Sequence, residues 1–168
     1  GVPFYIRTGK RMEQKCTEVV VQFKERSAHL FHGVAGDEPN AIIFRIQPDE
    51  SITVRLTIKK PGFTQAVRTM DTTLCYAQAG EARLAQAYER LILDALQGDQ
   101  TLFTHTDEIE AQWKFTSRIL DVWQNGKRQK PALYKPGSWG PKGADTLMRR
   151  DGRAWLPYKP SVCTLQNT

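Results

Sequence analysis

The sequence lacks a long apolar run, a nucleotide-binding glycine turn and a histidine in a catalytic setting. No stretch approaches the roughly 18 apolar residues of a membrane-spanning helix, and no signal-peptide pattern opens the chain. Residues 33–36 are rich in glycine but lack the strand-to-helix spacing of a dinucleotide fingerprint. His29, His32 and His105 have no metal-ligand or triad context. We therefore expect no membrane association, no metal site and no catalytic residue within these 168 residues.

Cysteine is scarce as well, at three residues. Cys16, Cys75 and Cys163 are an odd number and lack the spacing of metal ligands. This usage fits a reduced setting better than a disulfide framework, because disulfides persist mainly in oxidising compartments. The sequence therefore predicts a cytoplasmic protein with reduced cysteines.

Charge is not scarce, and the formal net charge of +6 invites a nucleic-acid interpretation. The basic residues are scattered along the chain, however, and no RNA- or DNA-binding motif is present. We expect no nucleic-acid partner, since a modest excess of Lys and Arg equally suits an enzyme of phosphorylated substrates. The length of 168 residues fits one domain with its own core.

Apolar and polar residues alternate through the first half of the chain, which is typical of half-buried strands. The alternating segments cover residues 2–7, 18–24, 42–47, 52–59 and 67–76. The second half changes to a helical period, at 82–96, from Thr106 to about 126, and at 141–150. The predicted buried stripe of the middle helix consists of Ile109, Trp113, Leu120 and Trp123. Strands followed by helices predict an α+β fold, with a largely antiparallel sheet covered on one face by helices.

Several cations lie on the polar faces of the predicted strands. These positions are Arg7, Arg45, Arg55 and Lys59, together with the amide of Gln47. Neighbouring like charges on a sheet are destabilising unless anions, carboxylates or a partner chain offset them. Simple solvent exposure is an equal alternative for Arg55 and Lys59. A ligand or interface role is favoured for Gln47, which lies beside a turn.

The tract at residues 2–15 feeds an alternating segment into a turn at Gly9 and then presents Lys10, Arg11 and Lys15. A strand end, a glycine turn and converging cations form a plausible cradle for an anionic small molecule. A solvated basic loop is the alternative that composition alone favours.

Five segments of the chain together resemble the carboxyl-terminal part of glucose-6-phosphate dehydrogenases. They are GVPFYIRTGKRM at 1–12, IIFRIQPDE at 42–50, KKPG at 59–62, AYERLILDALQGDQTLF at 87–103 and GSWGP at 137–141, followed by Ala144 and Asp145. The resemblance runs in the family's order from Gly1 to about Trp155. It implies a C-terminal portion of such an enzyme, with a sheet that is part of a larger one.

The resemblance also implies roles for individual residues. Lys10, Lys15 and Gln47 match positions that contact glucose 6-phosphate, while the Rossmann domain that binds NADP and the histidine general base lie upstream of residue 1. The whole enzyme would oxidise the sugar phosphate to its lactone with NADP, as a homodimer or homotetramer. The isolated chain would be inactive. The alternative is a non-catalytic assembly or regulatory module built on the same sheet.

Some members of that family hold a second, structural NADP in this domain. Arg7, Arg45 and Arg55 keep the basic character of such a site. Other matching positions depart from it, namely Cys16, Val20, Thr53, Thr73 and Trp139. Because a phosphate-rich ligand would lose several charge-assisted contacts at once, we expect no structural NADP in this chain.

Overall fold

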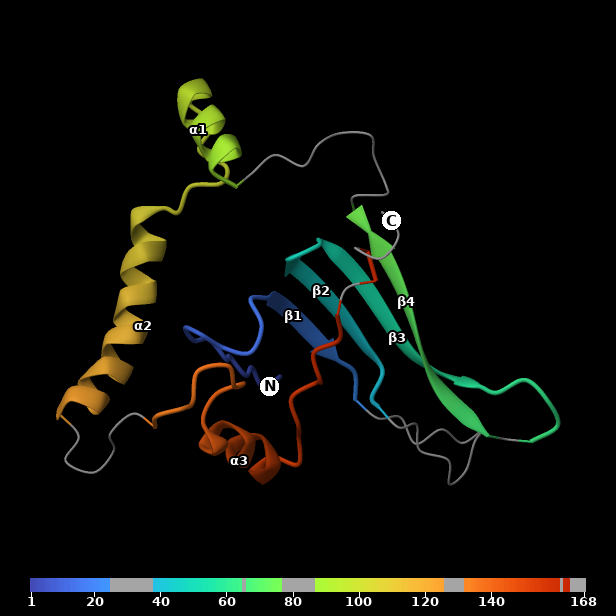
Figure 1. Cartoon of the computed structure of the whole chain (residues 1–168). Helices are drawn as coiled ribbons and strands as arrows, with labels where there is room; N and C mark the ends of the chain where they lie inside the picture. Colours follow the sequence, from blue (N-terminus) through green and yellow to red (C-terminus); the bar gives the residue numbers. More distant parts are fainter. Residues whose placement is uncertain (25–37, 65, 77–86, 126–131, 161, 164–168) are drawn as a thin grey trace.

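The computed structural model describes residues 1–24, 38–64, 66–76, 87–125, 132–160 and 162–163 (Figure 1). The strands are β1 (Thr17–Gln22), β2 (Ala41–Gln47), β3 (Ser51–Lys59) and β4 (Val67–Cys75), and the helices are α1 (Ala87–Gln97), α2 (Thr106–Asn125) and α3 (Lys142–Arg150). All neighbouring strands are antiparallel, in the order β1-β2-β3-β4. The predicted α+β class is therefore confirmed. His29, His32, residues 33–36 and residues 82–86 of the first predicted helix lie outside the described residues.

Turn chemistry explains where the strands and the first helix end. The hairpin between β2 and β3 passes through a cis Gln47–Pro48 bond and through Asp49, whose φ of 56° lies in the left-handed region that Asp tolerates. Across the next hairpin, the Lys60 amide donates to the Ala66 carbonyl at 2.8 Å. Gly98 follows α1 with a φ of 71°, as expected for a glycine that terminates a helix.

The two faces of the sheet differ in chemistry. Strand register places a polar set on one face, consisting of Glu18, Arg45, Ser51, Thr53, Arg55, Asp71 and Thr73. The opposite face carries an apolar set, consisting of Val19, Val21, Phe44, Ile46, Ile52, Val54, Leu56, Met70 and Leu74. The polar face is the covered one, since Arg55 is 1% exposed, whereas Val19 on the apolar face is 50% exposed.

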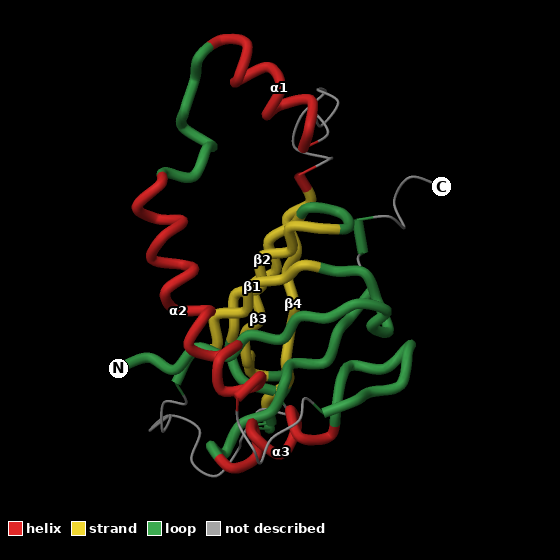
Figure 2. Tube along the Cα trace, turned by 90° about the vertical axis from the view of Figure 1, so that its left-hand side faces the viewer, coloured by secondary structure: helices red, strands yellow, loops and turns green. Residues whose placement is uncertain are grey.

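The cover of the polar face is the C-terminal segment 151–160 with 162–163, which we call the strap. Figures 1 and 2 show it running along one side of the sheet after α3. The Arg45 guanidinium donates to the Lys159 carbonyl at 2.6 Å and lies 5.1 Å from the centre of the Tyr158 ring. The Lys159 ammonium lies 3.2 Å from an Asp71 oxygen and 3.3 Å from a Glu38 oxygen. Backbone and side-chain contacts together fix the strap to the sheet.

The sequence predicts helices over one face of the sheet without specifying which face, and the structure shows the strap over the polar face. α1 and α2 stand off the sheet in Figure 1, and close packing between the described elements joins neighbouring strands. The predicted buried stripe of α2 is also wrong, because no residue of α2 is buried and Trp113 is 61% exposed. An amphipathic period shows that a helix has an apolar face but not what the face packs against.

The predicted strand at residues 2–7 is wrong as well, because this segment forms no part of the sheet. Side chains of this segment still alternate between exposed and half-buried, but the apolar ones are exposed and the polar ones are half-buried. Phe4 and Ile6 are 88% and 85% exposed, whereas Tyr5 and Arg7 are half-buried against the ring of Trp155. The Tyr5 hydroxyl also hydrogen-bonds the Asp151 carboxylate. Aromatic stacking with the strap decides the orientation of this segment.

The expectation of reduced cysteines is wrong for one pair. Cys75 and Cys163 form a disulfide with a Cα–Cα separation of 5.6 Å, and Cys16 is free. Three cysteines can still form one disulfide. Sequence spacing does not reveal which pair bonds when the two residues are 88 positions apart.

Among the described residues, no helix has the length and apolarity needed to cross a bilayer.

Arg55 is the most buried charge of the sheet. Its guanidinium donates to both Asp71 oxygens, at 2.7 and 2.8 Å, and lies 2.7 Å from a Glu38 oxygen. Asp71 lies directly across the β3–β4 ladder from Arg55. Carboxylates therefore offset the basic side chains of this face. The sequence had allowed carboxylates, bound anions or a partner chain in this role. Hydrogen bonding from Arg55 lowers the pKa of Asp71, and Lys159 acts in the same direction.

We predict that Arg55→Met lowers the free energy of unfolding of the full-length protein by about 3 kcal/mol, measured by urea denaturation. The substitution leaves Asp71 and Glu38 without their shared cation in a largely covered site. Arg150→Met is the matched control, because Arg150 is exposed at the end of α3 (Lys142–Arg150), and we expect it to stay within about 0.5 kcal/mol of the wild type. Equal effects of the two substitutions would contradict this account.

The ion pair between Arg55 and Asp71 predicts that stability depends on pH. A carboxylate whose pKa is lower in the folded chain adds stability above its unfolded pKa of about 3.9 and loses it as pH falls through the folded value. The stability difference between wild type and Arg55→Met should therefore be complete above about pH 5 and shrink below about pH 4. A difference that stays constant down to acid unfolding would show that Asp71 is not the partner that matters.

Candidate functional site

The basic tract that follows Gly9 is fixed from the far end of the chain. The Tyr134 hydroxyl donates to the Lys10 carbonyl at 2.7 Å, and the Gly137 amide donates to the Arg11 carbonyl at 2.8 Å. Met12 also forms an isolated parallel bridge with Ser138. These bonds hold the backbone and leave the side chains of the tract on the surface. Arg11 adopts a φ of 54° at this turn.

Lys10 and Lys15 are free cations in this arrangement. Both are exposed, and neither ammonium has a hydrogen bond or ion pair within the part of the chain that the structure describes. Cations held on a fixed backbone without carboxylate partners suit an anionic ligand, because nothing has to be displaced before it binds.

Gln47 lies at the same end of the sheet as Lys15. Strand register pairs Gln47 with Thr17, two positions after Lys15, and the Gln47 amide donates to the Thr17 hydroxyl at 2.8 Å. The structure therefore brings the predicted residues Lys15 and Gln47 to neighbouring strand ends. Lys10 comes from the tract that leads into the same strand end.

Gly9 allows the close approach of Tyr134. A Cβ atom built at Gly9 would lie 2.6 Å from the Tyr134 hydroxyl oxygen and 3.2 Å from the Met12 sulfur. The hydroxyl sits on a rigid ring and is already hydrogen-bonded to the Lys10 carbonyl. Glycine at this position is therefore required for the geometry of the basic tract.

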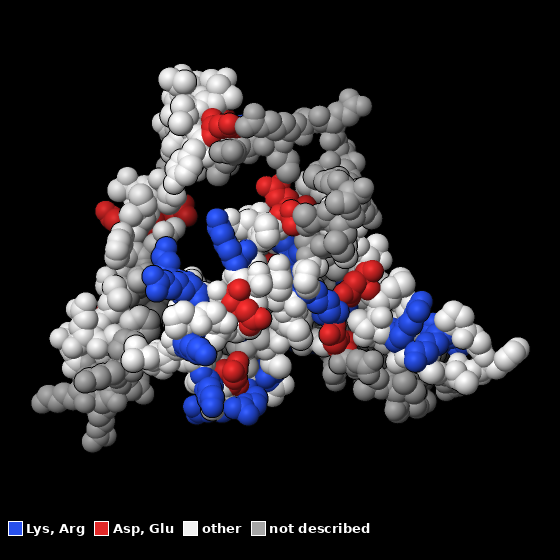
Figure 3. Space-filling model, viewed as in Figure 1, with Lys and Arg blue, Asp and Glu red and all other residues white. Residues whose placement is uncertain are grey.

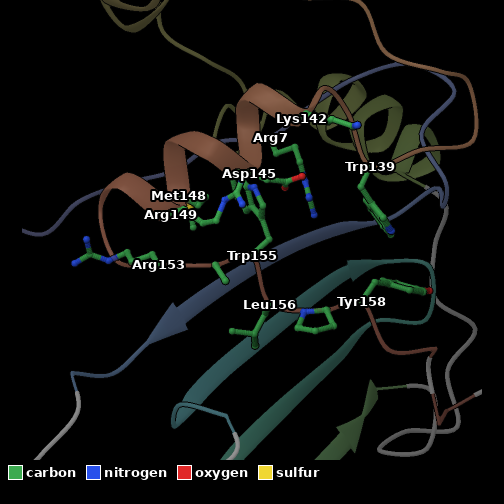
Figure 4. Close-up of a pocket in the computed structure, with 12 residues that line it drawn as sticks. Arg7, Trp139, Lys142, Asp145, Met148, Arg149, Arg153, Trp155, Leu156 and Tyr158 are labelled. Atoms are coloured by element: carbon green, nitrogen blue, oxygen red, sulfur yellow. The ribbon is translucent and has the colours of Figure 1, made fainter.

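Arg7 lines a cavity of about 650 Å³ between α3 and the strap (Figure 4). Its guanidinium lies 4.9 Å from the ring centre of Trp139 and 4.5 Å from that of Trp155, which are favourable cation–π distances. Burial lowers the pKa of Arg7, and the nearby Asp145 opposes the shift. The Trp155 indole nitrogen is buried without a hydrogen-bond partner.

Arg45 and Arg55 lie in a separate groove of about 230 Å³ beneath the strap. Arg45 pairs with Glu18 at 2.7 Å and bonds the strap, while Arg55 is occupied by carboxylates. The structure therefore separates the predicted residues into two sets. Lys10, Lys15 and Gln47 are available to a ligand, whereas Arg45 and Arg55 serve internal ion pairs.

Sequence reasoning missed Tyr134, which fixes the backbone of the site, and three strap residues that contact Arg7 and the polar face of the sheet, namely Trp155, Tyr158 and Lys159. All four come from segments without a helical or strand period. The cluster of aromatic residues in the strap was the available signal, since aromatic side chains outside regular elements often anchor a loop to a core.

The arrangement can bind an anion but shows no catalytic constellation. Within the described ranges, no cluster of three or more His, Cys, Asp or Glu residues is placed to hold a metal. On the face shown in Figure 3, acidic side chains lie among the basic ones, over α3 as well as over the sheet. Such mixing suits a small anionic ligand better than an extended polyanion.

Comparisons with known proteins find similar sequences and a similar fold. A sequence model described as the glucose-6-phosphate dehydrogenase C-terminal domain matches residues 1–156. Glucose-6-phosphate 1-dehydrogenase of Mycolicibacterium smegmatis is 47% identical over 156 residues, covering 92% of this chain and 31% of that protein. The Bacillus subtilis protein of the same name is 43% identical, covering 92% of this chain and 32% of that protein. The chain spans about a third of the length of these curated relatives.

Solved structures of the same name share the fold. The crystal structure of glucose-6-phosphate 1-dehydrogenase from Mycobacterium avium matches with a TM-score of 0.71 at 29% identity, covering 91% of this chain and 31% of that chain. A glucose-6-phosphate dehydrogenase in complex with its substrate glucose-6-phosphate matches with a TM-score of 0.73 at 27% identity, covering 90% and 30%.

We predict that Gly9→Ala destabilises the full-length protein by about 1–3 kcal/mol, because its Cβ would overlap the Tyr134 hydroxyl. The cost should shrink in a Tyr134→Phe background, which removes that oxygen, so a double-mutant cycle of unfolding free energies would show coupling. Gly143→Ala is the control, since nothing lies within 4 Å of its Cβ position in α3. An equal cost of Gly9→Ala in both backgrounds would refute the contact.

Proposed function

The chain belongs to the family of glucose-6-phosphate dehydrogenase C-terminal domains, and on this premise we propose that it is the C-terminal portion of such an enzyme. The enzyme oxidises D-glucose 6-phosphate to 6-phospho-D-glucono-1,5-lactone, the first step of the pentose phosphate pathway, in the cytoplasm. The observation that carries the proposal is the pair of unpaired cations, Lys10 and Lys15, at a strand end beside Gln47. A similar fold in a substrate complex supports it.

The role of this chain is to bind and orient the sugar phosphate. Lys10 and Lys15 donate from ammonium groups to the anionic substrate, and the Gln47 amide has a second hydrogen to offer beyond the one given to Thr17. Fixing the sugar in one pose lets C1 face the hydride acceptor. Such positioning accelerates hydride transfer, because the reacting groups no longer have to find their orientation. NADP, bound by an N-terminal domain, accepts the hydride.

The proton of the C1 hydroxyl requires a base outside this chain. None of the residues assigned to the substrate is a general base, since two are ammonium donors and one is an amide. The isolated chain is therefore inert, and residues 1–168 function as the substrate-binding and dimerisation part of a larger enzyme.

The apolar face of the sheet is the proposed subunit interface. Side chains on this face are exposed to an extent that is unusual for a folded protein, including Ile46 at 54% and Leu74 at 58%. A contiguous apolar sheet face of this kind is an interaction surface, because water contact costs free energy over its whole area. Pairing of two copies gives a homodimer, and two dimers give a homotetramer.

A structural NADP has no place in this domain. Arg45 and Arg55, which would face its phosphates, are held by Glu18, Asp71 and Glu38. The strap lies over the same face of the sheet, so a dinucleotide could bind there only by displacing the strap. The internal carboxylates replace the anion that a bound phosphate would supply.

We predict that Lys10→Ala and Lys15→Ala each raise the KM of the full-length enzyme for glucose 6-phosphate by roughly 10- to 100-fold, the loss of one charge-assisted contact. Initial-rate kinetics at saturating NADP measure the change. Lys15→Arg should retain most of the affinity, because it keeps the charge and the donors.

Lys60→Ala is the control for these variants. Lys60 is exposed and follows β3 at the opposite end of that strand from Ser51, so its removal changes net charge equally without touching the proposed site. An unchanged KM in both Lys10→Ala and Lys15→Ala would refute the assignment of the site.

We also predict that the intact enzyme binds one equivalent of NADP per subunit in isothermal titration calorimetry. The single equivalent belongs to the coenzyme domain. A second equivalent that disappears in Arg45→Ala would show that the groove beneath the strap accepts the dinucleotide after all.

A further inference from the structure

The disulfide lies at the point where the strap ends on the sheet. Cys75 is the last residue of β4, and Cys163 is the last described residue of the strap. Both residues are buried, at 5% and 7% exposure. The bond therefore closes the strap over the polar face after the ion pairs of Lys159, and it makes the attachment covalent.

The ion pairs at this end of the strap are weak on their own. The Lys159 side chain is 50% exposed, and ion pairs at exposed positions contribute little to stability because water screens them. The Arg45 guanidinium adds a hydrogen bond to the Lys159 carbonyl and a cation–π contact with Tyr158, whose ring also lies 5.8 Å from that of Trp139. The disulfide adds a covalent tie to the distal half of the strap, residues 156–160 with 162–163, and we expect the attachment of this half to depend on that bond more than on the ion pairs of Lys159.

The proximal half of the strap is anchored differently. Trp155 stacks on Arg7 and meets the Tyr5 ring edge-on, with centroids 6.4 Å apart. The carboxylate of Asp151 accepts from the Tyr5 hydroxyl. These contacts involve no sulfur, so loss of the disulfide frees the distal half alone.

We propose that Cys75 and Cys163 are a reversible redox latch on the strap. In the closed state the disulfide holds residues 156–160 and 162–163 over Arg45 and Arg55. A dithiol reductant opens it by two thiol–disulfide exchanges, in which two electrons and two protons pass to the cysteine sulfurs and the reductant becomes a disulfide. The product is two thiols, and the distal strap lifts from the sheet.

The redox conditions around the enzyme determine whether Cys75 and Cys163 are bonded. The inference rests on the proposed cytoplasmic setting, where a thiol reductant that reaches the bond opens the latch and oxidative conditions close it. Closure covers the polar face and ties the end of β4 to the chain's own C-terminal segment. Opening exposes two arginines whose carboxylate partners stay in place.

Limited proteolysis of the full-length enzyme tests the proposal. The protein is equilibrated with reduced or oxidised dithiothreitol, alkylated, and digested briefly with chymotrypsin, and cleavage after Tyr158 is followed by mass spectrometry. Because cleavage tracks the population of the open strap, we expect it to be at least about tenfold faster in the reduced protein. Equal rates in the two states would overturn the proposal.

Variants separate the latch from other thiol effects. Cys163→Ser should give the fast cleavage rate in both redox states, and Cys75→Ser should behave in the same way. Cys16→Ser is the matched control, since Cys16 is the free cysteine, and it should keep the full redox response. A redox response that survives Cys163→Ser, or disappears in Cys16→Ser, would overturn the assignment.

A redox titration distinguishes a switch from a purely structural bridge. The fraction of alkylated Cys163 is measured at fixed ratios of reduced to oxidised dithiothreitol, together with enzyme activity and near-ultraviolet circular dichroism as measures of the folded state. A latch is reduced and reoxidised while the protein stays folded. A bond that resists reduction until the protein unfolds, or never forms in the oxidised buffer, would contradict the proposal.

Discussion

The buried guanidinium of Arg55 is the constraint on which the rest of this structure depends. A cation with 1% exposure requires carboxylates at hydrogen-bond distance, and Asp71 and Glu38 supply them. The same carboxylates receive Lys159 and thereby bring the strap onto the sheet. Arg45 adds its bond to the strap backbone from the neighbouring strand. The ionic network and the Cys75–Cys163 disulfide together hold the strap over this face of the sheet.

Covering the polar face leaves the apolar face outward, the reverse of a typical two-layer domain. The exposed valine, isoleucine and leucine side chains of the sheet, and the unburied stripes of α1 and α2, are the surfaces on which the proposed subunit interface draws. The proposed subunit interface and the proposed substrate site lie on the same sheet, so assembly and substrate binding share one framework.

Sequence patterns predicted local structure well where the interacting residues are close together along the chain. The β2–β3 hairpin, the stop at Gly98 and the acidic first turn of α2 follow from alternation and capping residues within one or two elements. The strap, the inward turn of Arg7 and the Cys75–Cys163 bond were not predictable, because each depends on a partner about 90 to 150 positions away and carries no period. The turn after Gly9 made Lys10 and Lys15 candidates for an anion, family resemblance assigned them and Gln47 to the substrate, and that assignment stays a prediction.

The central claim is that the free cations of the tract after Gly9 hold the substrate, while the buried cations beneath the strap hold the protein together. A crystal structure of the full-length enzyme with glucose 6-phosphate tests it most directly. The account predicts the sugar phosphate within hydrogen-bond distance of the Lys10 and Lys15 ammonium groups and of the Gln47 amide, with the Arg55–Asp71 pair unchanged. A substrate phosphate bound to Arg45 or Arg55 beneath the strap would contradict it.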